Sequence, residues 1–501
     1  MTQNSDPGPQ KNREQPPERI STGVERLDDI LNGGLITERS YLVRGDPGTG
    51  KTILGLHYLT KGVENDETAL FINLEETTED IAQNAAGLGF DVDGINFLDL
   101  SPNSEFFADD QGYDIFESSE VERDPMVKAI TDRVEELDPD RVFVDPITQL
   151  RYLSTDEYQF RKQALSFMRL LSEYGATVLF TTQATENAPD EDLQFMSDGT
   201  IELGYTSTGR KISVPKFRGS SVENGNHSLK LNADGLTVFP EIRPDKHNKS
   251  FVEEKVSAGI PEVDELLCGG LNRGTVTVIS GPTGVGKTTT GTQFMKEAAG
   301  RGERSVIYLF EESEATFKQR SEAINTPVTK MCERGSLKVE EIEPLKVSPQ
   351  EFAERVRHEV EVEGTDIVMI DGVAGYKLSL RGEEDELITH LHSLNKYLKN
   401  MGVTVILIDE VANVTGEFQA TNVGISYLAD NIVFFRHLEF KGEMRKVIGV
   451  LKMRTSNFER TLREFEITKY GITVGDPLTN LQGILSGSPE WDTSPGHRSN
   501  D

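Results

Sequence analysis

The chain has 501 residues and a formal net charge of −32, from 84 acidic and 52 basic side chains. This acidic excess disfavours a broad nucleic-acid-binding surface, because contact with phosphate backbones requires clustered basic residues. It is also typical of proteins in concentrated salt, where screening limits repulsion between carboxylates, so we expect a halophilic origin. The two cysteines predict no disulfide framework and fit a reducing, cytoplasmic compartment.

Neither a membrane anchor nor a secretion signal is predicted. The best apolar run, at 403–408, has only the length of a strand. The first 20 residues are polar and contain four prolines, unlike a signal peptide. We therefore expect no membrane partner.

Short apolar runs alternate with helical patterns along the chain. Most contain four to six residues rich in β-branched types, as expected for strands that are buried on both faces of a parallel sheet. The strands predicted in chain order are 40–44, 69–74, 141–144, 177–181, 275–279, 306–310, 366–370 and 403–408. A helix is predicted at 53–62. The alternation predicts an α/β fold with mainly parallel β-sheets flanked by helices, and ligands at the carboxyl ends of the strands.

Two segments with the spacing G-x-x-x-x-G-K-[ST] follow the strands at 40–44 and 275–279. Glycines in this P-loop let backbone N–H groups surround phosphates. Lys51 and Lys287 would contact the β- and γ-phosphates, and the following threonines would offer a hydroxyl to Mg²⁺. The predicted nucleotide-binding residues are Gly45, Gly48, Thr49, Gly50, Lys51 and Thr52, and Gly281, Thr283, Gly284, Val285, Gly286, Lys287, Thr288 and Thr289. We predict two sites for ATP with Mg²⁺, with Thr52 and Thr288 on the metal.

The two loops belong to a repeat that spans whole domains. A shift of 236 residues aligns Lys51 with Lys287, and the same shift aligns Lys216 with Lys452. Such a register predicts a tandem duplication of one domain. The predicted parts are a disordered tail at 1–18, a first domain at 19–240, a linker at 241–252, a second domain at 253–485 and a flexible tail at 486–501.

Carboxylates follow the strands beside each P-loop. Asp145 and Asp371 each end an apolar strand, where they would orient Mg²⁺. The pairs Glu75-Glu76 and Glu311-Glu312 follow the strand after each P-loop helix and could polarise water or a hydroxyl for attack on the γ-phosphate. A turn with solvated acids is the alternative interpretation. Recurrence in both copies favours the catalytic one.

Two cations recur near the end of each copy. Lys216 and Arg218 match Lys452 and Arg454, and positions i and i+2 of a strand lie on one face. Cations so far from the P-loop in sequence suit a finger that contacts a neighbouring subunit's nucleotide, which can raise rates by about 10³- to 10⁵-fold. The alternative is a surface strand with salt bridges.

Together these motifs resemble the KaiC family of clock ATPases and autokinases, including its archaeal relatives. The resemblance covers about residues 18–488 and includes the tandem P-loops, the paired glutamates, the strand-end aspartates and a K-x-R-G-S-like strand. It implies two RecA-like domains in a hexameric double ring, with ATP between subunits. It further implies slow ATP hydrolysis in the first domain and Ser/Thr autophosphorylation in the second.

The resemblance places the phosphoacceptor at Ser426. The family has a Ser-Thr pair after an isoleucine, with the serine four residues before an aspartate. Here Ile425 precedes Ser426 and Asp430 follows, but Tyr427 replaces the threonine. The matching residue of the first copy is Gln194, which has no hydroxyl. We therefore expect the first domain only to hydrolyse ATP.

Two other functions stay open at this level. A RecA-like DNA motor would need basic loops, whereas the stretches after the strand-end aspartates offer only scattered cations such as Arg151, Lys377 and Arg381. A nucleotide-binding signalling scaffold would hardly turn over. The leading prediction is a homo-oligomeric ATPase and serine/threonine autokinase, a signalling or clock-type switch with protein partners and without nucleic acid.

Overall fold

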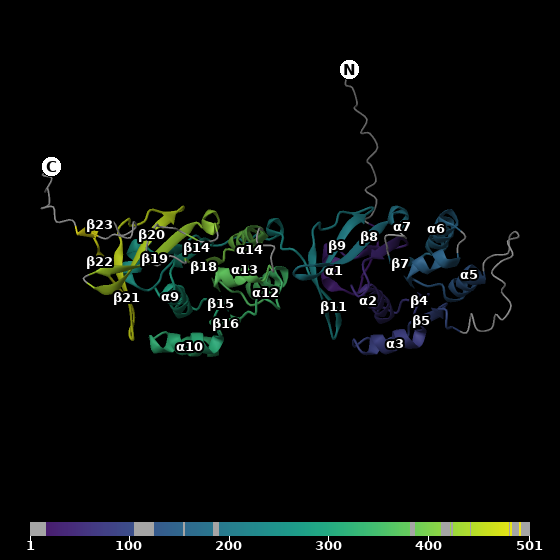
Figure 1. Cartoon of the computed structure of the whole chain (residues 1–501), viewed down its shortest axis with the longest axis horizontal. Helices are drawn as coiled ribbons and strands as arrows, with labels where there is room; N and C mark the ends of the chain where they lie inside the picture. The colour runs from purple at the N-terminus through teal and green to yellow at the C-terminus, as the bar shows by residue number, and fades with distance from the viewer. Residues whose placement is uncertain are drawn as a thin grey trace, which may run out of the picture. The chain divides into compact units, whose positions relative to one another are not determined.

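The computed structural model describes residues 17–104, 125–153, 156–183, 190–380, 386–411, 421, 424–440, 442–479, 481–482 and 490–491. The chain divides into two compact units between Glu241 and Ile242, which are treated separately below (Figure 1). Most of the two predicted tails lies outside the described residues.

In the described part of the first unit, a two-stranded sheet accompanies a nine-stranded sheet with the order β11-β10-β9-β8-β3-β7-β6-β4-β5. The strands are β1 (Arg19–Ile20), β2 (Leu35–Ile36), β3 (Ser40–Arg44), β4 (Ala69–Asn73), β5 (Asn96–Asp99), β6 (Arg141–Asp145), β7 (Thr177–Thr182), β8 (Gly199–Thr206), β9 (Gly209–Phe217), β10 (His227–Asn232) and β11 (Gly235–Phe239). The helices are α1 (Glu25–Ile30), α2 (Lys51–Glu64), α3 (Thr78–Ala86), α5 (Pro125–Leu137), α6 (Glu157–Glu173) and α7 (Glu191–Met196), with the 3₁₀ helix η1 (Ile147–Leu153).

The second unit has a nine-stranded sheet with the order β16-β15-β17-β18-β14-β19-β20-β21-β22, counted over its described residues. The strands are β12 (Lys255–Val256), β13 (Leu271–Asn272), β14 (Val276–Gly281), β15 (Ser305–Leu309), β16 (Leu337–Glu341), β17 (Ile367–Asp371), β18 (Thr404–Glu410), β19 (Asn431–Phe440), β20 (Glu443–Met453), β21 (Arg463–Thr468), β22 (Gly471–Pro477), β23 (Leu481–Gln482) and β24 (Glu490–Trp491). The helices are α8 (Pro261–Leu266), α9 (Lys287–Gly300), α10 (Glu314–Ala323), α11 (Val328–Glu333), α12 (Pro349–Glu361), α13 (Val373–Leu378) and α14 (Leu387–Asn400), with the 3₁₀ helices η2 (Pro244–Lys246) and η4 (Ile425–Tyr427).

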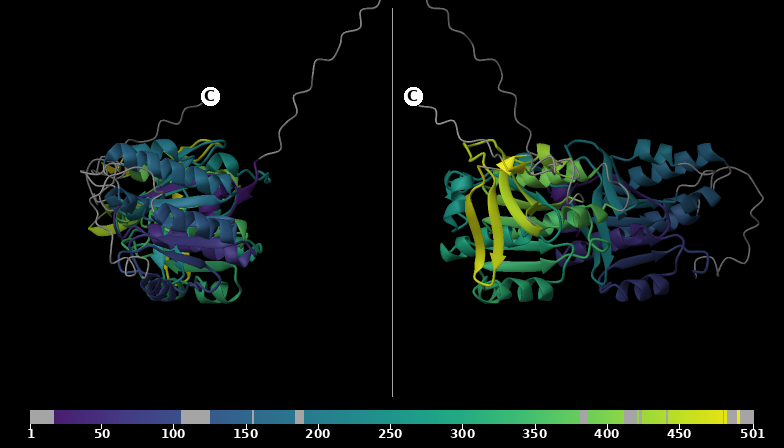
Figure 2. Two further views of the ribbon diagram at one scale, coloured as in Figure 1. Left: turned by 90° about the vertical axis from the view of Figure 1, so that its right-hand side faces the viewer. Right: turned by 60° about the vertical axis from the view of Figure 1, so that its left-hand side comes forward.

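Both large sheets have the same topology. In the first, β5, β4, β6, β7, β3 and β8 are parallel, and β9 to β11 continue as an antiparallel edge. The second sheet repeats this arrangement, and its antiparallel strands are yellow in the right-hand view of Figure 2. The predicted α/β class is confirmed, and the units are tandem RecA-like P-loop domains.

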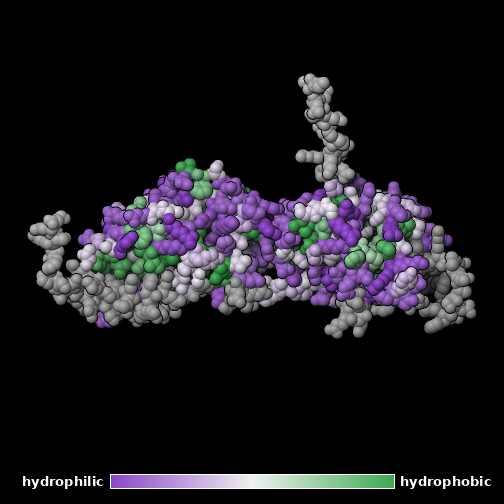
Figure 3. Space-filling view, turned by 90° about the horizontal axis from the view of Figure 1, so that it is seen from above, coloured by the Kyte–Doolittle hydropathy of each residue, from purple (hydrophilic) through white to green (hydrophobic). Residues whose placement is uncertain are grey.

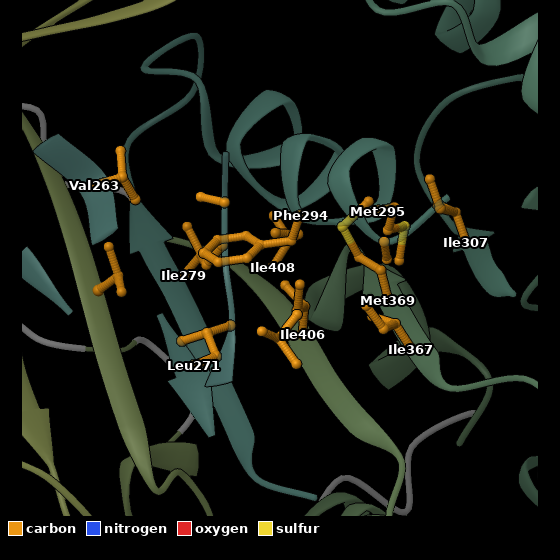
Figure 4. Close-up of a cluster of buried hydrophobic side chains, with 14 of the residues drawn as sticks. Val263, Leu271, Ile279, Phe294, Met295, Ile307, Ile367, Met369, Ile406 and Ile408 are labelled. Atoms are coloured by element: carbon orange, nitrogen blue, oxygen red, sulfur yellow. The ribbon is translucent and has the colours of Figure 1, made fainter. Parts of the chain in front are cut away.

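Each sheet is covered by helices on both faces, which explains the continuous apolar runs in the sequence. In β14, Val278 packs in the cluster that contains α12, α13 and α14, whereas Ile279 packs in the cluster that contains α9. Figure 4 shows Phe294 of α9 directed toward Ile279 of β14, and Met295 beside Met369 of β17. The core therefore fixes the central strands that lead to the P-loops.

The face of the molecule in Figure 3 is mostly hydrophilic, with hydrophobic patches between the polar side chains. Among the described residues, the structure contains no helix with both the length and the apolar character that a bilayer crossing requires.

His57 connects α2 to the antiparallel edge of the first sheet. Its Nε2 accepts a hydrogen bond of 2.8 Å from the N–H of Leu236 in β11, and its ring packs edge-on against Phe90. Burial lowers the pKa of His57 from 6.5 to about 4. The folded domain therefore holds this ring neutral.

We expect acid to destabilise the first domain between about pH 6.5 and pH 4, the interval set by the pKa of His57. Here the unfolded chain binds a proton that the folded domain excludes, so the free energy of unfolding falls as the pH falls. The shift corresponds to at most about 3 kcal/mol, less because the ring is partly exposed. Hydrogen exchange of α2, corrected for intrinsic rates, measures this change.

The control variant His57→Gln keeps an acceptor but does not titrate in this range. It should lose less protection than the wild type between pH 7 and pH 5. Equal losses in both proteins would show that other groups cause the acid sensitivity.

Candidate functional site

Each P-loop connects a central strand to a helix at the carboxyl edge of its sheet. The first lies between β3 and α2, which begins at Lys51, and the second between β14 and α9, which begins at Lys287. Gly50 and Gly286 precede these helices with φ of 109° and 113°, a conformation that favours glycine. The free N–H groups at both helix starts are suited to bind phosphate.

Lys51 and Lys287 fold back over their own loops. The Nζ of Lys51 donates to the carbonyls of the first two loop residues at 2.6 and 3.1 Å. The Nζ of Lys287 makes the matching bonds, both at 2.9 Å. Burial lowers the pKa of both lysines, and the main opposing charges are Asp145 in the first site and Glu410 in the second.

Other predicted loop residues shape the loops. The Thr49 hydroxyl donates to a carbonyl of its own loop at 2.8 Å. Val285 and Thr289 are buried, so their side chains support the second loop from within. The carbonyl of Thr283 lies 3.5 Å from the His437 ring.

The predicted Mg²⁺ residues meet in both units. The Thr52 hydroxyl donates to Asp145 at 2.5 Å, and the Thr288 hydroxyl donates to Asp371 at 3.2 Å. Burial raises the pKa of both aspartates. Hydroxyl and carboxylate oxygens are ligands that Mg²⁺ prefers, so the residues of each pair would hold this ion together with the nucleotide.

In the first unit the paired glutamates contact amides. Glu75 accepts a hydrogen bond of 2.9 Å from Gln183, and Glu76 accepts one of 3.4 Å from Asn84. Burial raises the pKa of the Glu76 carboxyl, and the nearby Asp145 adds to the effect. These carboxylates lie on the P-loop side of the sheet, after β4.

The second pair has different partners. Glu312 forms an ion pair with Arg320, and Glu311 accepts a hydrogen bond of 3.3 Å from the N–H of Gly375. Contacts within the chain therefore engage both carboxylates. The two sites are not equivalent in their candidate bases.

The predicted cation pairs lie at the end of each sheet where its parallel strands begin. The P-loops lie at the other end, where these strands finish. Lys216 and Arg218 flank Phe217, which pairs with Gly199 at the start of β8, and β8 runs parallel to β3. The second unit repeats this register. At about 3.3 Å per residue, roughly 15 Å of strand separates each cation pair from its own P-loop.

In the second unit these cations hold the predicted phosphoacceptor. The Nζ of Lys452 donates to the carbonyl of Ser426 at 2.9 Å, and Arg454 donates to the carbonyl of Tyr427 at 3.2 Å. Ser426 is half-buried in η4, whereas Tyr427 is exposed. We call η4 with its two cations the acceptor turn.

The first unit contains the same arrangement without the hydroxyl. Lys216 donates to the carbonyl of Gln194 at 2.6 Å, and Arg218 donates to the carbonyl of Phe195 at 3.3 Å. Gln194 thus occupies the counterpart of the acceptor position.

The structure adds a contact on each P-loop that the sequence did not predict. The carbonyl of Gly48 accepts hydrogen bonds from Tyr205 at 3.0 Å and from Arg210 at 3.3 Å. The carbonyl of Gly284 accepts one from Lys446 at 2.8 Å. The antiparallel hairpin therefore holds the P-loop in both units. The 236-residue shift that aligns the P-loop lysines also aligns Arg210 with Lys446. This match of two basic residues is the sequence pattern from which the contact could have been predicted.

A second unpredicted residue is Glu410, at the end of β18. It pairs with Gly281 in the register of the sheet, and its Oε2 lies 3.8 Å from the Nζ of Lys287. The counterpart in the first unit is Gln183, which follows β7. Because the two residues differ, comparison of the two copies did not identify this position as part of the site.

The scattered cations that a DNA motor would use give it little support. Arg151 stacks on Phe160 at 4.6 Å and forms an ion pair of 3.0 Å with Glu157. Lys377 lies in α13, and Arg381 lies outside the described residues.

Known proteins with similar sequences share both units. The family model described as "ATPase: KaiC" matches residues 20–243 and again 256–479. The circadian clock oscillator protein KaiC of Synechococcus elongatus is 28% identical over 487 residues, which cover 94% of this chain and 92% of that protein. The protein of the same name from Acaryochloris marina is 26% identical, with 94% and 91% covered. Circadian clock protein KaiC3 of Synechocystis sp. is 26% identical, with 95% of each chain covered.

We expect Mg²⁺-dependent nucleotide binding at the second site to weaken as the pH falls from 7.5 to 5.5. Burial raises the pKa of Asp371 to about 6, so its carboxyl becomes protonated in this range and attracts a cation less. The apparent Mg²⁺ affinity should fall about fourfold. A Lys51→Ala background disables the first site, and a fluorescent ATP analogue reports binding.

An Asp371→Asn variant shows how much of the loss of Mg²⁺ affinity at low pH comes from protonation of the nucleotide phosphates instead of Asp371. Its Mg²⁺ dependence should be weaker at both pH values and change less between them. The same pH response in this variant and in the wild type would contradict the role of Asp371.

Proposed function

Because the chain belongs to the KaiC ATPase family, we propose that it works as a homo-hexameric, Mg²⁺-dependent ATPase that phosphorylates itself on Ser426. The observation that carries this proposal is a single difference between two repeated sites. Both units have a P-loop, an oriented aspartate and an acceptor-turn geometry, but only the second unit has a hydroxyl at the acceptor position, where the first has Gln194. The first domain hydrolyses ATP, and the second transfers phosphate to protein.

The position of Ser426 supports transfer of phosphate between subunits. The acceptor turn lies at the amino edge of the second sheet, and the P-loop lies at its carboxyl edge. Ser426 therefore receives the γ-phosphate from the nucleotide of a neighbouring copy, and Arg218 and Arg454 reach neighbouring nucleotides in the same way. Head-to-tail contacts of this kind close into a ring when the rotation permits.

In the first domain the reaction is attack of water on the γ-phosphorus. Lys51 binds the phosphate oxygens, and Thr52 and Asp145 would hold Mg²⁺, which would supply neutralising charge for the β- and γ-phosphates. The carboxylate pair Glu75-Glu76 accepts the proton from water. The bond between the γ-phosphorus and the bridging oxygen breaks, and ADP and phosphate leave.

In the second domain a serine oxygen takes the place of water. Lys287, Thr288 and Asp371 bind the nucleotide and Mg²⁺ as in the first domain, with Glu311 and Glu312 as candidate bases. The Tyr427 hydroxyl lies 3.5 Å from the His392 ring. Phosphorylation at one serine would then mark the state of the ring, as a signalling or clock-type switch that protein partners read.

Incubation with Mg²⁺ and ATP should phosphorylate Ser426, as measured by mass spectrometry of the intact peptide. A mixture tests transfer between subunits, because Lys287→Ala removes the nucleotide site and Ser426→Ala removes the acceptor. If each subunit has one donor neighbour, a random 1:1 ring should carry about half of the wild-type phosphate on the Lys287→Ala chains.

Each variant alone should stay unmodified, and dilution should not change the yield of assembled rings. Phosphate on the Lys287→Ala protein alone would contradict the assigned site. An unmodified mixture of assembled rings would contradict transfer between subunits.

Arg218→Ala should lower ATP hydrolysis at the first site at least about 100-fold, because a finger in trans stabilises the charge of the transition state. A Lys287→Ala background isolates this site, and phosphate release is measured. Arg133→Ala, which removes an exposed ion pair with Glu136, is the matched control. Mixing Arg218→Ala with Lys51→Ala chains should restore up to about a quarter of the activity. Full activity of Arg218→Ala alone would exclude the finger.

A further inference from the structure

We propose that Lys399 is a positioning residue for phosphate transfer in the second domain, an inference that rests on the proposed autokinase function. Lys399 binds the buried carboxylate of Asp430 and thereby leaves the guanidinium of Arg454 available for the nucleotide of the neighbouring subunit. It lies in the last turn of α14, outside both the P-loop and the acceptor turn. None of the repeated motifs contains it.

Asp430 connects the acceptor turn to the central strands of the sheet. It lies between η4 and β19 and is buried. Its carboxylate accepts a hydrogen bond of 3.0 Å from the N–H of Val276 at the start of β14, and its carbonyl accepts one of 3.0 Å from the N–H of Arg454. Burial removes the water that would solvate this charge, so the carboxylate needs a cationic partner.

Lys399 is that partner. Its Nζ donates to the two carboxylate oxygens of Asp430 at 2.9 and 2.7 Å. The Nη1 of Arg454 lies 3.8 Å from the same carboxylate, which is beyond hydrogen-bond distance. The Arg454 side chain is 51% exposed, and a guanidinium has five N–H donors. Donors of Arg454 therefore remain for a phosphate outside the chain's own domain.

The first domain has the same aspartate. The N–H of Asp198 donates to the carbonyl of Ser40 at 2.8 Å, as the N–H of Asp430 does to that of Val276. The carboxylate of Asp198 also accepts a hydrogen bond of 3.3 Å from the N–H of Ser40. The side chain of Asp198 is 32% exposed, whereas that of Asp430 is 6% exposed. Water therefore solvates part of the first carboxylate, and the second depends more on its ion pair.

The lysine is replaced by a serine in the first domain. The N–H of Gly175 donates to the carbonyl of Ser172 at 3.1 Å, and the N–H of Gly402 donates to that of Lys399 at 3.0 Å, so these two turns match. The Ser172 hydroxyl lies 3.4 Å from the hydroxyl of Ser40. A neutral side chain thus occupies the position of the ammonium. The additional cation is found in the domain that has the acceptor hydroxyl.

Removal of Lys399 would leave the buried carboxylate facing Arg454, whose guanidinium is already close. The guanidinium would turn toward Asp430, because charge-assisted hydrogen bonds to a carboxylate are strong. It would then stabilise less of the charge on the phosphate that passes to Ser426. Transfer would slow, while the chain's own P-loop would bind nucleotide as before.

The first test uses Lys399→Met, which keeps an apolar stem and removes the charge. Full-length protein is incubated with Mg²⁺ and ATP, phosphorylation of Ser426 is followed by mass spectrometry, and binding of a fluorescent ATP analogue is measured in parallel. We expect a rate at least about 10-fold lower, from the loss of one charge-assisted contact. Lys399→Arg should stay within about threefold of the wild type because it restores a cation.

The matched control is Lys396→Met, an exposed lysine of the same helix, which should phosphorylate at the wild-type rate. Nucleotide affinity should be unchanged in all three variants. Phosphorylation in Lys399→Met as fast as in Lys396→Met would refute the inference. A loss of nucleotide affinity in Lys399→Met would refute it too, because Lys399 would then act on the P-loop.

A double variant separates a slow site from an unstable domain. Lys399→Met combined with Asp430→Asn has no unpaired buried charge, so the penalty of a broken buried ion pair is absent. The neutral amide also attracts the guanidinium of Arg454 less. We expect the double variant to recover most of the wild-type rate. A double variant as slow as Lys399→Met would contradict the action of Lys399 through Asp430.

Mixed rings show which chain needs Lys399. In a mixture of Lys287→Ala with Ser426→Ala chains, the first supplies Ser426 and Arg454, and the second supplies the nucleotide. Adding Lys399→Met to the Lys287→Ala chain should slow phosphorylation at least about 10-fold. Adding it to the Ser426→Ala chain should leave the rate unchanged. Equal slowing in both mixtures would indicate a general defect of the second domain and refute the positioning role.

Failure of this inference differs from failure of the proposed function. A wild-type protein that never modifies Ser426 refutes both. A wild-type protein that modifies Ser426, beside a Lys399→Met protein that does so equally fast, refutes the inference and leaves the proposed function standing.

Discussion

Parallel strands impose a direction on each domain, and the arrangement of the sites depends on it. Every P-loop follows the carboxyl end of its central strand, while the acceptor turn and its cations lie where the neighbouring strand begins. A side chain cannot cross the length of a strand to reach its own nucleotide. The geometry thus separates the nucleotide site of each domain from the lysine and arginine at the opposite end of its sheet.

The two domains show how little needs to change on a duplicated backbone. The strand topology and the hydrogen bonds from the P-loop lysines to their loop carbonyls are the same in both. Chemical differences between the two sites include side chains at matching positions, such as Gln194 against Ser426 and Gln183 against Glu410. At the carboxyl edge of the sheet, one substitution exchanges an amide that orients a neighbour for a group that can take up a proton.

The sequence was sufficient for the fold class, the parallel strands and the P-loop residues, because these depend on local patterns that survive duplication. It also predicted that Thr52 and Asp145 serve one site, because the carboxyl ends of the strands in a parallel sheet lie at the same edge. It did not predict the contacts of Arg210 and Lys446 with the P-loops, which depend on the path of an antiparallel hairpin. Nor did it predict that Lys452 holds the Ser426 carbonyl, because such long-range contacts to backbone oxygens leave no residue pattern.

One strand spans the distance between the two edges in each domain. In the second domain, Lys446 of β20 donates a hydrogen bond to the P-loop carbonyl of Gly284. Farther along the same strand, Lys452 donates one to the acceptor turn. In the first, β9 does the same with Arg210 and Lys216. A strand held by its neighbours is stiff along its axis, so one rigid element connects the P-loop with the distant turn. The same strand therefore fixes the position of the P-loop relative to the opposite end of its own sheet.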